Sequence, residues 1–597
     1  MEDILFLVGK ENIKQKISIT SIMMWLLVIF VIFVSLYVYI FQKKNYIYFQ
    51  KIADNFKNIS FILPAKRGNI LDANNKYLVK SIESWNLYIN LDKATDEEKE
   101  IFLNLAKAKK IFYRGNYAFI SNLSLDEISS VMIKITNEKN KYKYLELIPS
   151  FSRENYLGEA AGSMIGYLGF DENAEDDIFV GKAGLELTYD NYLKGKEGKI
   201  VYQHLPNGDK GDKIEEIEPV DGYDIKTTII SDFQKKAYEL MKNYFEENNY
   251  KRGALIALNP KTGAVYALIS YPSYNPDWFL NNIQQATKIL SDPNHPLFNR
   301  AIAGLYSPGS TIKPIVAIGA LSENVITPEK KIYAGGELKI PNPYIPGTYS
   351  IFRDNKVHGW TDMKKAIAES VNIYFYILGG GFGDQPGLGI EKLIKWWKIF
   401  QLDQLSGIDI LGEKPGFLPT PENKKELHPI DPIWRLGDTY NVSIGQGDLL
   451  VTPLRITLWT SALATNKLVK PFLVQEIKDK HNNIIFQRKT EYIWENLLND
   501  KYLKIVQEGM RQTVTNGTAK YLNDLPFPVA GKSGTPEILG KKKLNAIFTG
   551  YAPYPDPEIV MTLLIEDVPL GSVATLPLYK QIITEYFKIT HPEFFKM

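Results

Sequence analysis

A serine and a lysine lie three residues apart in the stretch YSPGSTIKP, which runs from Tyr306 to Pro314. Pro308 and Gly309 predict a turn, and Ser310 begins an apolar stretch typical of a helix. Residues three apart lie on one side of a helix, so Lys313 would lie one turn beyond Ser310. The pair could be a nucleophile and its base if burial or a second cation lowers the lysine pKa. It could also be an ordinary helix start, with Ser310 as the N-cap.

No other serine in the chain has a lysine three positions later. A second candidate stretch is ESVNIYFYILG, in which Ser370 and Asn372 are two residues apart. From a turn between helices, both side chains could face one cleft, where the hydroxyl relays a proton and the amide binds substrate. A second helix cap is the structural alternative.

The third stretch, VAGKSGTPE, contains Lys532, Ser533, Gly534 and Thr535 and is typical of a strand edge. A lysine beside two hydroxyl groups could bind a carboxylate. Gly534 would allow the backbone of a ligand to approach closely. A polar turn is the alternative interpretation.

The composition limits the other possibilities. A chain of 597 residues predicts two or three domains, and 45% apolar with 23% charged residues is ordinary for a globular protein. The net charge of +2 does not point to nucleic acid as a partner. The absence of cysteine excludes disulfides, thiolate metal sites and a cysteine nucleophile.

An uncharged segment covers residues 17–42 and is bracketed by Lys16 and Lys43. About 20 apolar residues in a helix span the ~30 Å hydrocarbon core of a bilayer. The bulky exit sequence YVYIFQKK lacks the small residues of a cleavage site, which favours an uncleaved anchor over a signal peptide. A buried core helix is the alternative, and lysines on both sides leave the orientation undecided.

The order of elements predicts two folded parts after the anchor. Residues 43–225 mix short strands, turns and a few helices, and carry no visible chemistry. Asp232 then predicts the cap of a helix that runs to about Phe245. A hairpin in GALIALNPKTGAVYALISYP comes next, helices follow, and strands return in AIFTGYAP and EIVMTLLIED. The first and last strands are expected to share one sheet, with helices packed on it.

Taken together and in this order, SxxK, SxN and K[ST]G form the signature of the penicillin-recognising serine acyltransferases. Over nearly its whole length the chain resembles a class B penicillin-binding protein. PAKRGNILD, with Arg67, Gly68 and Asp72, and GLELTYDNYLKGKEG are similar to the family's pedestal segments. NRAIAGLYSPGSTIKP and NVSIGQGDLLVTPLR are most similar to the elongation-specific subfamily, penicillin-binding protein 2.

The resemblance implies an α/β (α+β) transpeptidase domain, with a central antiparallel sheet flanked by helices. An elongated mixed α/β pedestal of the dimerisation type and one transmembrane helix would precede it. The expected parts are a cytoplasmic tail at 1–16, the anchor at 17–42, the pedestal at 43–225 and the transpeptidase domain at 226–597.

The resemblance also implies a role for each motif residue in D,D-transpeptidation of peptidoglycan stem peptides. Ser310 would attack a D-Ala-D-Ala carbonyl, and Lys313 would take the proton of Ser310. A D-alanine would then leave, and a neighbouring stem amine would resolve the acyl-enzyme. The remaining roles would be proton relay or tuning by Ser370 and Lys532, amide binding by Asn372, carboxylate binding by Ser533 and Thr535 around Gly534, and an oxyanion hole made by the backbone N–H groups of Ser310 and Thr535.

Metal chemistry is not expected. Some members of the subfamily bind zinc through a cysteine inside the SxN element and an upstream histidine. Here Val371 occupies the middle of that element and the chain has no cysteine, so we predict no zinc site and no cofactor. His358 is therefore interpreted as a structural loop residue.

Related functions remain as alternatives: a β-lactamase or β-lactam sensor, a D,D-carboxypeptidase, a septal class B transpeptidase, or a scaffold that activates a glycan polymerase. The resemblance implies stem peptides, β-lactams, the inner membrane, a SEDS-family (RodA-type) glycosyltransferase and other elongation-complex membrane proteins as partners. It also implies a single-pass protein of the inner membrane, with most of the chain in the periplasm.

Overall fold

The computed structural model describes residues 21–46, 58–107, 109–114, 116–138, 140–170, 179–205, 210–342, 345–538, 543–569 and 571–596. The tail predicted at 1–16 lies outside these residues. By its contacts the chain divides into two compact units. The first contains residues 1–63 and 197–219, and the second contains 64–196 and 220–597. The predicted boundary between residues 225 and 226 stays a prediction.

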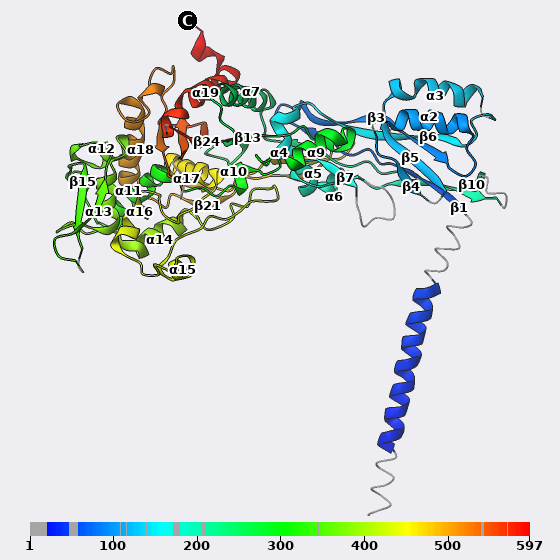
Figure 1. Cartoon of the computed structure of the whole chain (residues 1–597), viewed down its shortest axis with the longest axis horizontal. Helices are drawn as coiled ribbons and strands as arrows, with labels where there is room; N and C mark the ends of the chain where they lie inside the picture. The colour runs from blue at the N-terminus through cyan, green and yellow to red at the C-terminus, as the bar shows by residue number, and fades with distance from the viewer. Residues whose placement is uncertain are drawn as a thin grey trace, which may run out of the picture. The chain divides into compact units, whose positions relative to one another are not determined.

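The first unit contains the apolar helix and a small sheet. The helix Ser21–Tyr46 has 26 residues, and in the described part of the chain it is the one helix long and apolar enough to cross a membrane. It is the dark blue helix in Figure 1, and its side chains are exposed. It extends four residues beyond the predicted end at 42, because nothing in FQKKNY breaks a helix. The antiparallel sheet has the order β1-β9-β10, with bounds Asn58–Leu63, Gly198–His204 and Lys210–Ile217.

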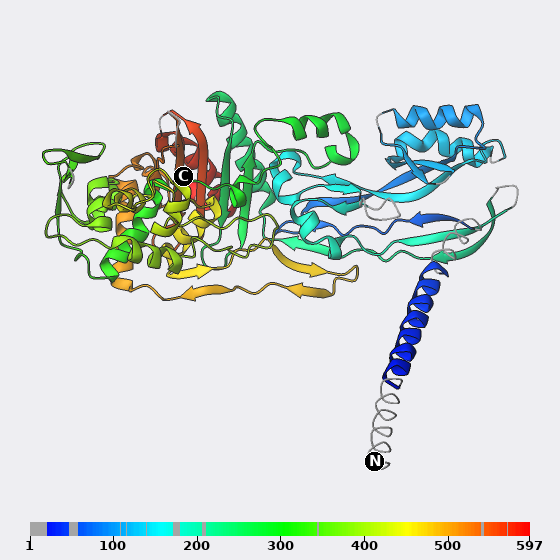
Figure 2. The ribbon, with the colours of Figure 1, turned by 60° about the horizontal axis from the view of Figure 1, so that its bottom comes forward.

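An eight-stranded sheet forms one part of the second unit, in the order β20-β19-β11-β2-β3-β5-β4 with β6 also paired to β3. Two helices, α2 and α3, contact its long strand β3, and each begins with a capping box. Figure 2 shows the late strands β19 and β20 in gold, extending toward the blue and cyan strands. The bounds are Ile70–Leu71 (β2), Tyr77–Asn90 (β3), Phe112–Arg114 (β4), Tyr117–Leu123 (β5), Leu145–Asn155 (β6), Asp224–Thr227 (β11), Val474–Lys478 (β19), Ile484–Gln487 (β20), Asp96–Ala106 (α2) and Leu125–Asn137 (α3).

The two pedestal-like segments quoted above meet in a buried ion cluster. Glu186 accepts hydrogen bonds from Nε of Arg67 at 2.6 Å and from Nε of Arg153 at 2.8 Å. Nη2 of Arg67 also lies 2.8 Å from a carboxylate oxygen of Asp190. Gly68 is required beside this cluster, since a Cβ there would lie 1.9 Å from the carbonyl oxygen of Tyr223.

The predicted cap of α7 is wrong. The helix runs from Ser231 to Glu247 with Ile230 at the N-cap, so Asp232 lies inside its first turn. Asp72 performs the capping instead, because its carboxylate accepts hydrogen bonds from the backbone N–H of Ser231 at 3.3 Å and from the Ser231 hydroxyl at 2.5 Å. Asp232 forms an exposed ion pair with Lys76.

The predicted shared sheet of the second folded part is confirmed. The hairpin strands β12 and β13 and the late strands β22, β23 and β24 form one antiparallel sheet in the order β13-β12-β24-β23-β22. Alternate residues of β12 belong to two buried clusters, one on each face of the sheet. Figure 1 shows α7 and α19 together near β13 and β24, and α17 lies against β24 and β12. The strand bounds are Gly253–Leu258 (β12), Val265–Tyr271 (β13), Ala530–Gly534 (β22), Leu544–Ala552 (β23) and Ile559–Val568 (β24).

The other elements connect or cover these sheets. The helices are Gly158–Ala161 (η1), Gly162–Ile165 (α4), Gly184–Thr188 (α5), Asp190–Leu193 (α6), Trp278–Asn281 (α8), Ile283–Ser291 (α9), Arg300–Ala303 (α10), Gly309–Ile312 (η2), Lys313–Ser322 (α11), Met363–Ala368 (α12), Asn372–Gly380 (α13), Gly389–Ile399 (α14), Pro421–Leu427 (α15), Leu436–Ser443 (α16), Pro453–Thr465 (α17), Asp500–Thr515 (α18), Lys520–Leu522 (η3), Gly571–Ala574 (η4), Leu576–Thr590 (α19) and Pro592–Phe595 (η5). The strands are Leu168–Phe170 (β7), Phe179–Gly181 (β8), Ile332–Ala334 (β14), Glu337–Pro341 (β15), Tyr349–Arg353 (β16), Gly359–Thr361 (β17), Lys467–Val469 (β18) and Tyr492–Glu495 (β21).

Candidate active site

Ser310 lies in a short turn that is fixed on both sides. Gly309 has φ of +53°, a left-handed conformation that glycine adopts without strain. Its N–H donates to the carbonyl oxygen of Gly445 at 2.9 Å, and Tyr306 and Val451 exchange two backbone hydrogen bonds of 2.9 Å. The 3₁₀ turn η2 then leads into α11, which starts at Lys313. Residues 445–451 therefore brace the turn that presents Ser310.

Lys313 is fully buried beneath this turn. Its Nζ donates to the backbone oxygen of Ser370 at 2.7 Å, to Oδ1 of Asn372 at 2.6 Å and to the Ser370 hydroxyl at 3.3 Å. Burial lowers the pKa of Lys313 to about 7, while the negative charge of Asp354 opposes this fall. A substantial fraction of the amine is thus neutral near pH 7 and able to accept a proton.

The SxN element forms the turn between α12 and α13. Ser370 has φ of +61°, an unusual conformation for a residue with a side chain. This left-handed residue reverses the chain after α12, so that Asn372 becomes the first residue of α13. Both the backbone and the side chains of the turn therefore reach the Lys313 amine.

The K[ST]G element lies on β22, the edge strand predicted from the sequence. Lys532 is fully buried and donates from Nζ to the carbonyl oxygen of Ser533 at 2.9 Å. Burial lowers the pKa of Lys532, and the nearby charge of Lys313 lowers it further. A Cβ at Gly534 would lie 2.9 Å from the carbonyl oxygen of Pro308 and 3.0 Å from Cγ2 of Thr311. Gly534 therefore leaves room for the Ser310 turn. This packing role is additional to the close approach of a ligand that the sequence predicts.

Two residues that the sequence analysis missed hold the hydroxyl groups of this element. The hydroxyls of Thr518 and Ser533 are 2.7 Å apart, and Oγ1 of Thr535 accepts a hydrogen bond from the N–H of Ser572 at 2.9 Å. Neither partner belongs to a motif or has a telling spacing, so the sequence carries no signal for them.

A cleft of about 1430 Å³ brings the three motifs together. Ser310, Ser370, Asn372, Ser533 and Thr535 all line it. Lys313, Lys532 and Gly534 are not among its lining residues and lie buried behind it. The motif residues thus present hydroxyl and amide groups to the cleft, and the two lysines lie in the interior behind it. Further lining residues are Leu305, Tyr306, Ser307, Arg353, Asn355, Tyr376, Phe417, Leu427, Asn441, Ile444, Gln446, Gly447, Asp448, Leu450, Thr518, Glu537, Ile538, Asn545 and Ser572.

His358 connects two polar side chains inside the fold through its ring nitrogens. Its side chain is fully buried, with Nδ1 2.7 Å from a carboxylate oxygen of Glu369 and Nε2 2.9 Å from Oδ1 of Asn355. The two ring nitrogens thus face different oxygens on opposite sides of the ring. Within the described residues, no three His, Asp or Glu side chains are grouped as metal ligands would be.

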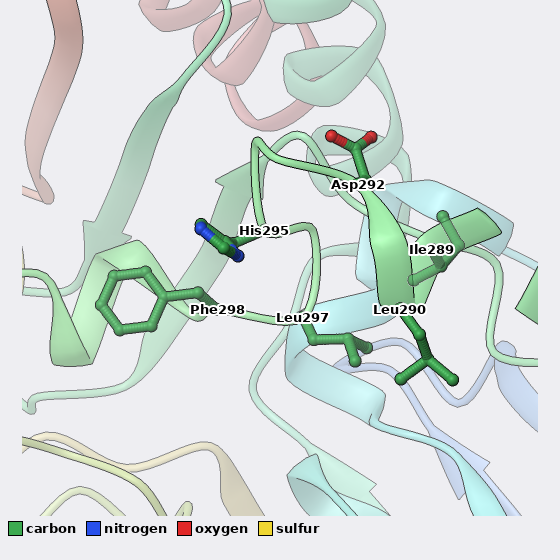
Figure 3. Close-up of a pocket in the computed structure, with 6 residues that line it drawn as sticks. All are labelled: Ile289, Leu290, Asp292, His295, Leu297 and Phe298. Carbon is green, nitrogen blue, oxygen red and sulfur yellow. The ribbon is translucent and has the colours of Figure 1, made fainter. Parts of the chain in front are cut away.

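A second, smaller pocket of about 540 Å³ lies at the end of α9. Figure 3 shows that its titratable side chains, Asp292 and His295, point in different directions among aliphatic and aromatic neighbours. None of the three motifs contributes to its lining, so the candidate chemistry belongs to the larger cleft.

Comparisons with known proteins agree with this geometry. The family model of the penicillin binding protein transpeptidase domain matches residues 253–584, and that of the penicillin-binding protein dimerisation domain matches residues 62–227. The chain is 30% identical to the peptidoglycan D,D-transpeptidase MrdA of Haemophilus influenzae over 642 aligned positions, covering 98% of this chain and 93% of the relative.

Two solved structures have a similar fold. A complex of PBP2 and MreC from Helicobacter pylori has a TM-score of 0.72 at 24% identity, covering 89% of this chain and 99% of that one. A chain from a structure described as the structural coordination of polymerization and crosslinking by a peptidoglycan synthase complex has a TM-score of 0.71 at 26% identity, covering 89% and 92%.

Proposed function

The chain belongs to the penicillin-binding protein transpeptidases, and we propose that Ser310 is the nucleophile with which it cross-links peptidoglycan stem peptides. The observation that carries this proposal is the buried Lys313 amine, whose pKa is lowered by burial to about 7, one helical turn from Ser310. Such an amine can take the serine proton as the hydroxyl attacks the D-Ala-D-Ala carbonyl.

The other motif residues support the same reaction in distinct ways. The Ser370 hydroxyl, 3.3 Å from Nζ of Lys313, can relay a proton to the leaving D-alanine amine. Asn372 lines the cleft and can bind the substrate amide, while Ser533 and Thr535 can bind the terminal carboxylate. The N–H groups of Ser310 and Thr535 would stabilise the oxyanion, and loss of such a donor typically costs ~10²–10³ in rate. Lys532 tunes the site from the interior, and Gly534 keeps the K[ST]G strand against the Ser310 turn.

The cellular role that fits best is wall synthesis during elongation, because the curated relative is an MrdA enzyme. A septal role is not favoured. The solved relatives occur with MreC and in a peptidoglycan synthase complex, which supports elongation-complex membrane proteins, including a RodA-type glycosyltransferase, as partners. The helix Ser21–Tyr46 would anchor the protein in the inner membrane, with most of the chain in the periplasm.

The test is covalent labelling of the full-length protein in detergent with a penicillin, followed by intact-mass measurement. We expect a stable adduct on the wild type and none on Ser310→Ala. Rapid drug hydrolysis with loss of the adduct would indicate a β-lactamase. A folded protein with no adduct would favour the scaffold alternative.

A further inference from the structure

Asp354 is a buried carboxylate beside the active site that belongs to none of the three motifs. It follows β16 directly, and its side chain is 1% exposed. One carboxylate oxygen accepts a hydrogen bond from the backbone N–H of Ile373 at 3.0 Å. The other lies 3.5 Å from Nε2 of His358.

The contact with Ile373 replaces a missing helix cap. Helix α13 begins at Asn372 with Val371 at the N-cap, and Val371 has no side chain that could accept a hydrogen bond. The first N–H groups of a helix have no partners within the helix, so an acceptor must come from elsewhere. Asp354 supplies it at the residue directly after Asn372, whose Oδ1 accepts a hydrogen bond from Lys313.

The same loop also holds the other side of the SxN turn. Glu369 immediately precedes the left-handed Ser370, and its carboxylate lies 2.7 Å from Nδ1 of His358. The N–H of His358 donates to the carbonyl oxygen of Ala334 at 3.0 Å, which ties the loop to β14. Residues 354–358 therefore clamp the Ser370–Asn372 turn from both ends.

Asp354 also places a carboxylate near the buried Lys313 amine. The titratable groups on the elements that hold Lys313 are Lys532 on β22, Asp354 and His358 on the loop, and Glu369, which pairs with Lys356 at 3.3 Å. Of these groups, Asp354 is the one whose charge raises the pKa of Lys313 against the effect of burial.

We propose that Asp354 is a positioning residue for acyl transfer: it fixes the start of α13, and thereby Asn372 and the acceptors around the Lys313 amine, and it places a buried negative charge near that amine. This inference rests on the proposed function of Ser310 and Lys313. It assigns a role to a residue outside the motifs that carry the family signature.

The test compares Asp354→Asn with wild type in the full-length protein. Asparagine can still accept the Ile373 hydrogen bond but lacks the charge. The readout is the pH dependence of the acylation rate with a fluorescent penicillin. Without the carboxylate, protonated Lys313 is less stable, so we expect the midpoint of the profile to move to lower pH. An unchanged midpoint would overturn the proposal.

Two further variants sharpen the result. Asp362→Asn is the matched control, because Asp362 caps the adjacent helix α12 by accepting from the N–H of Lys365 at 3.0 Å. Asp362→Asn should leave the pH midpoint of acylation unchanged, and a shift equal to that of Asp354→Asn would overturn the proposal.

The variant Asp354→Ala removes both the charge and the helix cap. We expect acylation to slow by up to ~10²-fold, as displacement of a reacting group can cause.

A stability readout separates this inference from the proposed function. If the wild type is not acylated at all, the proposed function fails, and unfolding temperatures at ~pH 6 and ~pH 8.5, on either side of the Lys313 pKa, become the test. On going from the higher to the lower pH, the unfolding temperature of Asp354→Asn should fall further than that of wild type. This extra fall should vanish when Lys313→Met is present in both proteins. Its persistence there would mean that a group other than Lys313 carries the effect, and it would overturn the proposal.

Discussion

Two regions of the molecule bury cations, and they do so in opposite ways. Near the pedestal-like segments, Arg67 and Arg153 share the carboxylate of Glu186, with contacts of 2.6 and 2.8 Å. Beside the cleft, Lys313 and Lys532 are fully buried and donate hydrogen bonds to neutral oxygens.

The difference is whether a buried cation has a carboxylate partner. At the pedestal-like cluster the arginines hold the pKa of Glu186 below its ordinary value despite burial, so this carboxylate stays ionised between them. Burial lowers the pKa of Arg153 as well, while the charge of Glu186 opposes that fall. At the cleft, burial with no directly paired carboxylate lowers the pKa of both lysines. A buried cation held by neutral acceptors can lose its proton near neutral pH, and that is the property a catalytic base requires.

The largest expected effect comes from removing the proposed base. Lys313→Met should slow acylation by about 10²–10⁴-fold, the usual contribution of a positioned general base. It should not lower the unfolding temperature, because an apolar side chain of similar length replaces an amine that is costly to bury away from water. Acylation kinetics and thermal unfolding test both parts. A strongly destabilised variant would make Lys313 a structural cation like Arg67 and remove the contrast.

The corresponding change at the pedestal-like cluster is Glu186→Gln, which removes the carboxylate. It leaves two buried arginines without a charged partner, and we expect the folded state to lose about 3–5 kcal/mol. The acylation rate per folded molecule should stay the same. Denaturant unfolding and active-site titration measure the two quantities. Asp232→Asn, which breaks the exposed ion pair with Lys76, is the control and should change stability little.

The sequence could predict the parts of the site whose residues lie a few positions apart in a recognisable motif. Ser310 and Lys313, the SxN turn and the edge strand with Lys532 were all expected, and so was the sheet that joins β12 to β24. What it could not predict are contacts between residues far apart in the chain. Asp72 caps α7 from 159 positions away, where the sequence had suggested Asp232, because a helix cap needs only an oxygen at the right place.

The pH dependence of acylation tests whether the buried amine beside the cleft loses its proton near neutral pH, as the comparison requires. As the proposed base, Lys313 can take a proton only when it is neutral, and burial lowers its pKa to about 7. Acylation should therefore be constant above this pH and fall about tenfold per unit well below it, since each unit reduces the neutral fraction tenfold. Stopped-flow labelling between mildly acidic and mildly alkaline pH measures the profile. A flat profile would mean that Lys313 does not take the proton.

The smallest expected effect concerns Thr518, whose hydroxyl lies 2.7 Å from that of Ser533. Thr518→Val keeps the shape but removes this hydrogen bond, so the Ser533 hydroxyl is held less firmly for the substrate carboxylate. The net value of such a bond is about 1 kcal/mol, which corresponds to roughly a fivefold slower acylation. The pH midpoint should not move, because no charge changes near Lys313. A shift of the midpoint would mean that the hydroxyls of the K[ST]G strand are coupled to the buried lysines, and the division between the hydroxyls that line the cleft and the amines buried behind it would have to be abandoned.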